Sequence, residues 1–249
     1  MKLAYDRGGE GPALLVLLHG LGATREVWSA LLETHRWRGT WLAPDLRGHG
    51  ASPHAAAYSL GLYAADVADL VAETGTFDSI VILGHSLGGA VALALASGWS
   101  GISPSRVFGL GIKAVWTKEE IAGMRKISSA PVRYFATREE AVQRYLKVSG
   151  LNGLVQPDSR MAGAGVVRAA EGWRLAYDQA CAGVSPPPMA ALMAAAQAPV
   201  HLARGSLDAM NSLDQLAAFD PDARDLPGGH NVMVENPSAA WRWLEERLP

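Results

Sequence analysis

Residues 79–96 read SIVILGHSLGGAVALALA. The SIVIL run is typical of a strand buried on both faces, and the residues from Leu87 onward have the composition of a helix. Ser86 lies where the two meet, between Gly84 and Gly88, in a G-x-S-x-G pattern. Glycine is unfavourable inside strands and costs about 1 kcal/mol relative to alanine inside a helix. The pattern therefore predicts a sharp strand-to-helix turn at which larger side chains would collide.

Such a turn predicts a nucleophile. It holds the serine in a strained backbone conformation, with Oγ clear of the sheet edge. It also directs the free N–H groups at the start of the helix toward any oxyanion that forms beside the serine. We predict that Ser86 is the nucleophile and that the Leu87 N–H is one donor of an oxyanion hole.

A serine hydroxyl needs a base, and the base needs a group to orient it. Among seven histidines, His230 lies in the Gly-rich stretch GGHNVMVENP, between a short predicted strand and the last helix. Asp208 follows the buried run PVHLAR at 199–204, which gives the chain order Ser…Asp…His. These positions predict a Ser86–His230–Asp208 triad, with Glu119 as the next acid to consider.

A second oxyanion donor is predicted in the stretch LLHGLGATREVW, directly after the strand run ALLVLL at 13–18. A Gly-flanked loop at a strand end can present a backbone N–H, and we assign this role to Leu21, with Gly20 beside it in the substrate site. One such donor typically lowers the barrier by about 2.7–4 kcal/mol.

The stretch GLGIKAVWTKEE, residues 109–120, raises a further possibility. Its strand run is interrupted by Lys113 and closed by Trp116, where the carboxyl ends of strands face a ligand crevice. In one interpretation Lys113 reaches solvent and Trp116 is packing. In the other, Trp116 forms an apolar wall of the substrate pocket and Lys113 attracts a substrate that carries a carboxylate or polar tail.

The order of elements predicts an α/β fold with a mostly parallel sheet covered by helices on both faces. Unbroken aliphatic runs occur at 13–18, 40–44, 79–83, 107–112 and 199–204, and helical patterns lie at 26–35, 59–74, 86–97, 212–219 and 237–248. From 117 to 198 this alternation stops, and helices are predicted at 118–129, 137–150, 165–180 and 189–198. We expect a core of residues 1–116 and 199–249, with a helical cap (lid), 117–198, inserted after the sixth strand over the carboxyl edge of the sheet.

The amino-acid composition limits the classes of partner and the cellular location that we expect. The 249 residues contain 22 Lys+Arg and 24 Asp+Glu, a net charge of −2, which gives no electrostatic case for nucleic acid or an anionic membrane as the main partner. The single cysteine, Cys181, excludes an internal disulfide and favours a reducing, cytoplasmic location. The apolar run from Ala13 is interpreted as a core strand rather than a signal peptide, and no run approaches a membrane span.

Together these motifs resemble the α/β-hydrolase fold superfamily over nearly the whole chain, as a serine carboxylesterase-like member with a cap. HGLG resembles the oxyanion loop, PDLRGHGAS the loop after the next strand, GHSLGG the nucleophile turn, RGSLD the acid turn and GGHNVMVENP the histidine loop. The resemblance implies structural roles for Asp45, Arg47, Gly48 and Gly50.

Differences within the superfamily narrow the expected reaction. Haloalkane dehalogenases and epoxide hydrolases of this fold carry Asp where this chain has Ser86, and the hydroxynitrile lyases carry a Lys beside the catalytic histidine, where this chain has Asn231 and Val232. We therefore expect hydrolysis of small to medium carboxylic esters or lactones, with no metal or organic cofactor. Two alternatives remain open: a carbon–carbon bond hydrolase with the same triad, and a ligand receptor or scaffold with little turnover. The sequence does not indicate an oligomeric state.

Overall fold

The computed structural model, which describes residues 1–248, contains a seven-stranded sheet in the order β1-β3-β2-β4-β5-β8-β9. Only the edge strand β1 is antiparallel to its neighbour, so the other strands direct their carboxyl ends to one edge. The predicted α/β class is confirmed. The strands are β1 (Tyr5–Gly8), β2 (Ala13–Leu18), β3 (Thr40–Pro44), β4 (Ser79–His85), β5 (Arg106–Leu110), β8 (Val200–Gly205) and β9 (Arg224–Leu226).

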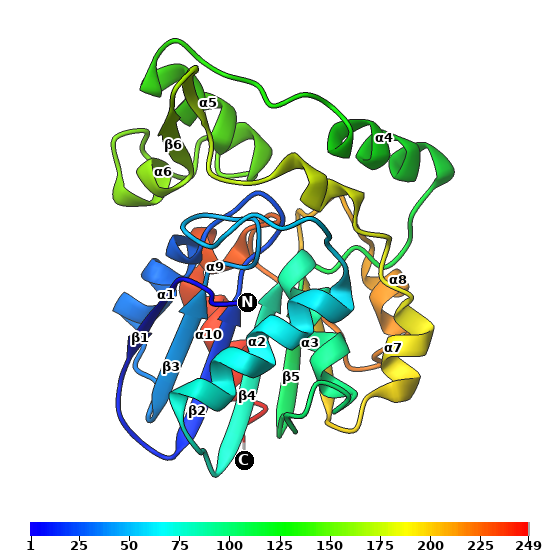
Figure 1. Ribbon diagram of the computed structural model, residues 1–249. Helices are drawn as coiled ribbons and strands as arrows, with labels where there is room; N and C mark the ends of the chain where they lie inside the picture. Colours follow the sequence, from blue (N-terminus) through cyan, green and yellow to red (C-terminus); the bar gives the residue numbers. More distant parts are fainter. Residues whose placement is uncertain (249) are drawn as a thin grey trace.

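Helices cover both faces of this sheet (Figure 1). Leu15 and Leu17 of β2 pack into one hydrophobic cluster and Leu14 and Val16 into another, which explains why the strand sequences do not alternate with polar residues. α2 (Leu60–Thr74), α3 (Leu87–Ala96) and α8 (Leu213–Ala217) contribute to the cluster of Leu14; η1 (Arg25–Trp28), α1 (Ser29–Thr34), α9 (Val232–Glu235) and α10 (Pro237–Glu245) contribute to the cluster of Leu15.

Much of the segment 117–198 extends beyond the carboxyl ends of the strands, where α4, α5 and α6 lie at the top of Figure 1, whereas α7 lies beside the central sheet and packs into the cluster of Leu14. This segment follows β5, the fifth strand in chain order, so the predicted insertion after a sixth strand is not confirmed. Its elements are α4 (Lys118–Ser128), α5 (Arg138–Val148), α6 (Arg160–Ala164), β6 (Val166–Ala169), β7 (Gly172–Leu175), η2 (Gln179–Gly183) and α7 (Met189–Ala195).

The predicted helix at 165–180 is wrong, because β6 and β7 form an antiparallel hairpin there. Val166, Val167 and Trp173 are residue types that favour strands. Gly172 has φ +142°, which most side chains avoid, and its neighbour Trp173 exchanges backbone hydrogen bonds with Phe135 at 2.7 and 2.9 Å. Backbone pairing with a distant residue therefore decides the local structure, and the segment is not purely helical.

Two helices of this segment are attached to the rest of the protein in different ways. The buried residues of α5, among them Tyr145 and Leu146, belong to the same hydrophobic cluster as Leu15 of the central sheet. α4 has no buried residue, although a capping box formed by Thr117 and Glu120 defines its start. α5 thus packs into the hydrophobic cluster of the central sheet, whereas α4 lies on the surface.

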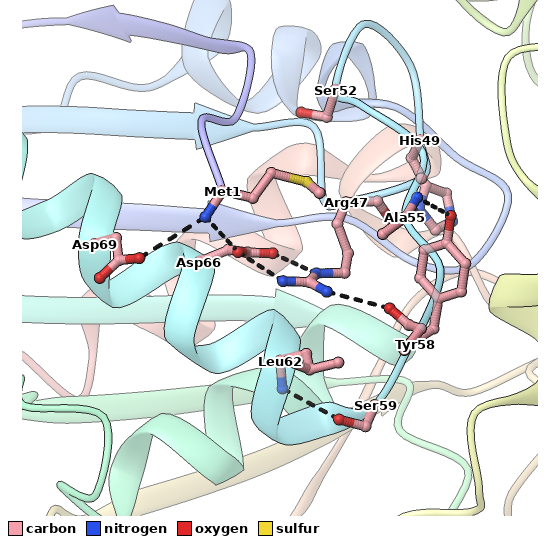
Figure 2. Close-up of polar contacts among 12 residues, drawn as sticks. Met1, Arg47, His49, Ser52, Ala55, Tyr58, Ser59, Leu62, Asp66 and Asp69 are labelled. Carbon is pink, nitrogen blue, oxygen red and sulfur yellow. Dashed lines mark hydrogen bonds and ion pairs between the residues drawn. The ribbon is translucent and has the colours of Figure 1, made fainter.

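The loop after β3 is fixed by buried ion pairs. Arg47 donates from Nε and Nη2 to the Asp66 carboxylate on α2, at 2.5 and 2.8 Å (Figure 2). Asp45 accepts the N–H groups of Arg25 and Ala51, at 2.8 and 2.9 Å, and forms an ion pair with the Arg25 guanidinium. Within residues 1–248, no helix has the length and apolar character needed to cross a membrane.

Candidate active site

The turn at Ser86 has the strained geometry that its sequence predicts. Ser86 has φ 51° and ψ −113°, and it is the only residue other than glycine with positive φ within residues 1–248. A Cβ atom at Gly84 would lie 2.2 Å from the Gly88 carbonyl oxygen, and one at Gly88 would lie 2.2 Å from the Leu18 carbonyl oxygen. Both glycines are therefore required by the close approach of β2, β4 and α3.

Ser86 lines a cavity of about 700 Å³, a size typical of small-molecule sites. It is the N-cap residue of α3, but its hydroxyl makes no capping hydrogen bond, so Oγ is not committed to the helix. Leu87, the first residue of α3, and Leu21, in the loop after β2, line the same cavity. Within the described residues, neither of these backbone N–H groups donates a hydrogen bond, so both are available to a ligand.

His230 and Asp208 form a hydrogen-bonded pair. The His230 Nδ1 atom lies 2.8 Å from Asp208 Oδ2, and Asp208 Oδ1 accepts the Met210 N–H at 2.9 Å. Burial acts to raise the pKa of the Asp208 carboxyl, but the hydrogen bond and charge of His230, with the Met210 N–H, outweigh burial and hold this pKa below its ordinary value. An ionised Asp208 fixes a hydrogen on Nδ1 and leaves Nε2 as the free base. The alternative acid, Glu119, lies in the exposed first turn of α4, and among residues 1–248 the acid paired with His230 is Asp208.

Ser86 and His230 both line the cavity, but within residues 1–248 the Ser86 hydroxyl donates no hydrogen bond. Contacts between nucleophile and base are often long without substrate and shorten in the reactive complex. The structure thus brings the predicted nucleophile and base to one cavity without a hydrogen bond between them.

Sequence reasoning missed two residues that hold the histidine loop. His85, the residue before Ser86, has Nε2 2.9 Å from the His230 carbonyl oxygen, and the two ring centres are 4.5 Å apart. The Asn231 side chain donates to the carbonyl oxygens of Ser149 and Gly150, at 3.2 and 3.0 Å. His85 and His230 are 145 positions apart, so no local pattern could reveal their contact.

The predicted substrate residues Gly20, Lys113 and Trp116 all line the cavity. Lys113 does not extend freely into solvent: its Nζ lies 2.9 Å from Glu120 Oε1 and 3.2 Å from the Met210 carbonyl oxygen. The same ammonium group lies 5.5 Å from the centre of the Trp116 ring. Lys113 thus connects the acid loop to the start of α4, and an acidic neighbour offsets its charge.

Most of the remaining lining is apolar, and much of it comes from residues 117–198. These residues include Met124, Ile127, Val148, Val184, Pro186 and Pro187. Within residues 1–248, no group of three or more His, Cys, Asp and Glu side chains is arranged to hold a metal ion. The lining suits an apolar organic chain beside Ser86.

Comparison with known proteins identifies the family. A family model described as the alpha/beta hydrolase family matches residues 15–242, so the chain belongs to that family. It is 38% identical over 90 residues to lipase LipV of Mycobacterium tuberculosis, a match that covers 36% of this chain and 34% of the lipase. It is 40% identical over 98 residues to the pimeloyl-[acyl-carrier protein] methyl ester esterase of Aeromonas hydrophila, covering 39% of this chain and 36% of the esterase. The matches thus span about a third of these curated relatives.

Solved structures extend the similarity in fold to almost the entire chain. The structure of E-2-(acetamidomethylene)succinate hydrolase matches with a TM-score of 0.80 at 22% identity, covering 98% of this chain and 94% of that one. The thioesterase domain from the curacin biosynthetic pathway matches with a TM-score of 0.78 at 20% identity, over the same shares of both chains. At these identities the likeness shows the fold alone.

Proposed function

We propose that the protein is a serine hydrolase that cleaves carboxylic ester or lactone bonds of small to medium substrates through an acyl-enzyme. The observation that carries this proposal is the 2.8 Å pair of His230 and Asp208, with His230 lining the same cavity as Ser86 at its strained turn. The relatives named as a lipase and a methyl ester esterase favour an ester substrate.

In the proposed mechanism, His230 Nε2 removes the proton from Ser86 Oγ as Oγ attacks the carbonyl carbon of the ester. The backbone N–H groups of Leu21 and Leu87 donate to the oxyanion, and the start of α3 adds a favourable dipole. The His230 imidazolium, stabilised by Asp208, then protonates the departing alcohol. Water, deprotonated by His230, attacks the acyl-enzyme and releases the acid and free Ser86.

We propose that residues 117–198 act as a cap over this site, with residues 1–116 and 199–249 as the hydrolase core. The cap supplies much of the apolar lining, and Trp116 at its start forms one wall. In this arrangement Gly20 lets the oxyanion loop pack closely against the nucleophile turn, because a Cβ atom at Gly20 would lie 2.9 Å from His85 Nδ1 and 3.2 Å from Ser86 Cβ.

A panel of p-nitrophenyl esters, from acetate to decanoate, tests the proposal together with a dienol-ketone substrate for carbon–carbon bond cleavage. We expect ester turnover in the wild-type protein and a loss of at least about 1,000-fold in Ser86→Ala, since the triad acts as a unit. Turnover of the dienol ketone without any ester would reassign the reaction. Stoichiometric labelling by a fluorophosphonate without turnover of either substrate would favour the receptor alternative.

A further inference from the structure

The charged side chains that line the cavity are not all paired. Apart from histidines, the cavity is lined by Lys113, Glu120 and Lys147. Lys113 and Glu120 form an ion pair at 2.9 Å, so their fields largely cancel a few ångströms away. Within the described part of the chain, no carboxylate lies within ion-pairing distance of Lys147, whereas Asp208 is paired with His230 and does not itself line the cavity. Lys147 thus contributes a positive charge that no ion pair offsets.

Lys147 is an exposed residue in the last turn of α5 that lines the cavity. Its neighbour Val148 packs against the oxyanion loop, since a Cβ atom at Gly22 would lie 3.0 Å from Val148 Cγ1. Two residues further on, Gly150 accepts a hydrogen bond from Asn231, the residue after His230, at 3.0 Å. The end of α5 is therefore held between the oxyanion loop and the histidine loop.

We infer that Lys147 makes this site selective for esters whose chain ends in a carboxylate, with the ester at Ser86 and the carboxylate at the Lys147 ammonium. This inference rests on the proposed function. A single cation beside an apolar wall attracts an anionic substrate over a longer range than an ion pair does. The charge expected of Lys113 from sequence is offset by Glu120, so Lys147 is the main selecting residue.

Lys147 also has a simpler role available, because a cation in the last turn stabilises a helix through its dipole. A purely structural role would change the turnover of charged and neutral esters alike. The two roles are therefore separated by a ratio of activities rather than by either activity alone.

The experiment compares p-nitrophenyl hydrogen adipate with its neutral isostere, the p-nitrophenyl ester of adipic acid monoamide. The readout is the ratio of their kcat/KM values at pH 7.5 and low salt. We expect Lys147→Met to lower this ratio about fivefold, and 0.5 M NaCl to remove most of the difference. Lys126→Met is the matched control, since it removes the same charge from exposed α4 at a position outside the cavity lining, and its ratio should stay within about 1.5-fold of wild type.

The Lys113–Glu120 ion pair allows a second set of variants in the same experiment. Glu120→Gln keeps the capping box, because glutamine also serves at that position, but it frees the Lys113 charge and should raise the ratio. The double variant Lys113→Met/Glu120→Gln leaves the net charge of the cavity unchanged and should keep the ratio within about twofold of wild type.

The inference is overturned if Lys147→Met and Lys126→Met change the ratio equally, or if Lys147→Met lowers the turnover of both esters by the same factor. Failure of the proposed function has a different signature: the wild-type protein then hydrolyses neither ester, or Ser86→Ala hydrolyses both.

Discussion

His85 Nε2 lies 2.9 Å from the carbonyl oxygen of His230, so the residue beside the proposed nucleophile holds the loop that carries the proposed base. Because a carbonyl oxygen only accepts, His85 must carry its hydrogen on Nε2. Burial lowers the pKa of His85 well below its ordinary value, which keeps the ring neutral. The turn after β4 and the histidine loop are thereby joined directly.

Removing that hydrogen bond should reduce catalysis without abolishing substrate binding. We expect His85→Leu to lower kcat by about tenfold to hundredfold with little change in KM, because a small displacement of the base is costly. His85→Gln retains a donor and should recover part of the loss. His201→Leu, a strand histidine outside the cavity lining, is the control. Unchanged kcat in His85→Leu would show that the hydrogen bond does not position His230.

Strain at Ser86 predicts an unusual order of stabilities. Ser86→Ala removes the hydroxyl but keeps a Cβ atom at φ 51°, whereas Ser86→Gly relieves the strain. In urea titrations, we expect the free energy of unfolding of Ser86→Gly to be about 1 kcal/mol higher than that of Ser86→Ala. Both variants should be inactive toward esters. Equal or reversed stabilities would argue that the backbone at Ser86 stores no strain.

Asp208 should contribute to turnover by fixing the tautomer of His230. In Asp208→Asn an amide replaces the acceptor that fixes the hydrogen on Nδ1, and we expect kcat to fall by about 10⁴-fold while the fold is retained. Circular dichroism and ester turnover provide the measurement. A variant with near-normal turnover would reassign the acid, and Glu119→Gln would be tested next.

His19 should make stability depend on pH. Its Nδ1 donates to the Gly20 carbonyl oxygen at 2.8 Å and its Nε2 accepts the Leu46 N–H at 2.9 Å, so the neutral ring satisfies both partners. Burial lowers the pKa of His19 to about 4, although its hydrogen bond to Gly20 opposes this shift. Between that value and about 6.5, the unfolded state binds the additional proton, so stability falls as pH falls.

This linkage amounts to about 2 kcal/mol of unfolding free energy lost at His19 between pH 7.5 and pH 5. Urea unfolding at both values measures it, and His19→Gln should lose less stability than wild type over the same interval. If the variant and the wild type lose the same amount, His19 does not remain neutral in the folded protein.

The parts of the fold that sequence predicts well are those with strong local signals. The aliphatic run of β2 is buried on both faces, and the close approach of Gly84 and Gly88 requires the glycines on either side of Ser86. The sequence predicts a helix where Val166–Leu175 forms a hairpin, because a short segment can fit the periodicity of a helix or of a strand. Backbone pairing with Phe135 favours the strands.

The site is only partly visible in the sequence for a related reason. Chain order places the proposed triad, but the environment of each charge depends on contacts between distant elements. The Lys113–Glu120 pair offsets a charge that sequence alone leaves free, whereas no sequence pattern distinguishes Lys147, because a basic residue in the last turn of a helix is ordinary. His85 likewise forms its contact across 145 positions.

The most direct test of the central claim, that Ser86 is the nucleophile, is to locate the group that reacts with a fluorophosphonate probe. We expect peptide mass spectrometry to find one phosphonyl group per chain, attached to Ser86 Oγ, and no labelling in Ser86→Ala. Labelling should also slow sharply in His230→Ala, because the hydroxyl then lacks its base. Modification of another residue, or equal labelling of Ser86→Ala, would contradict the assignment of Ser86 as the nucleophile.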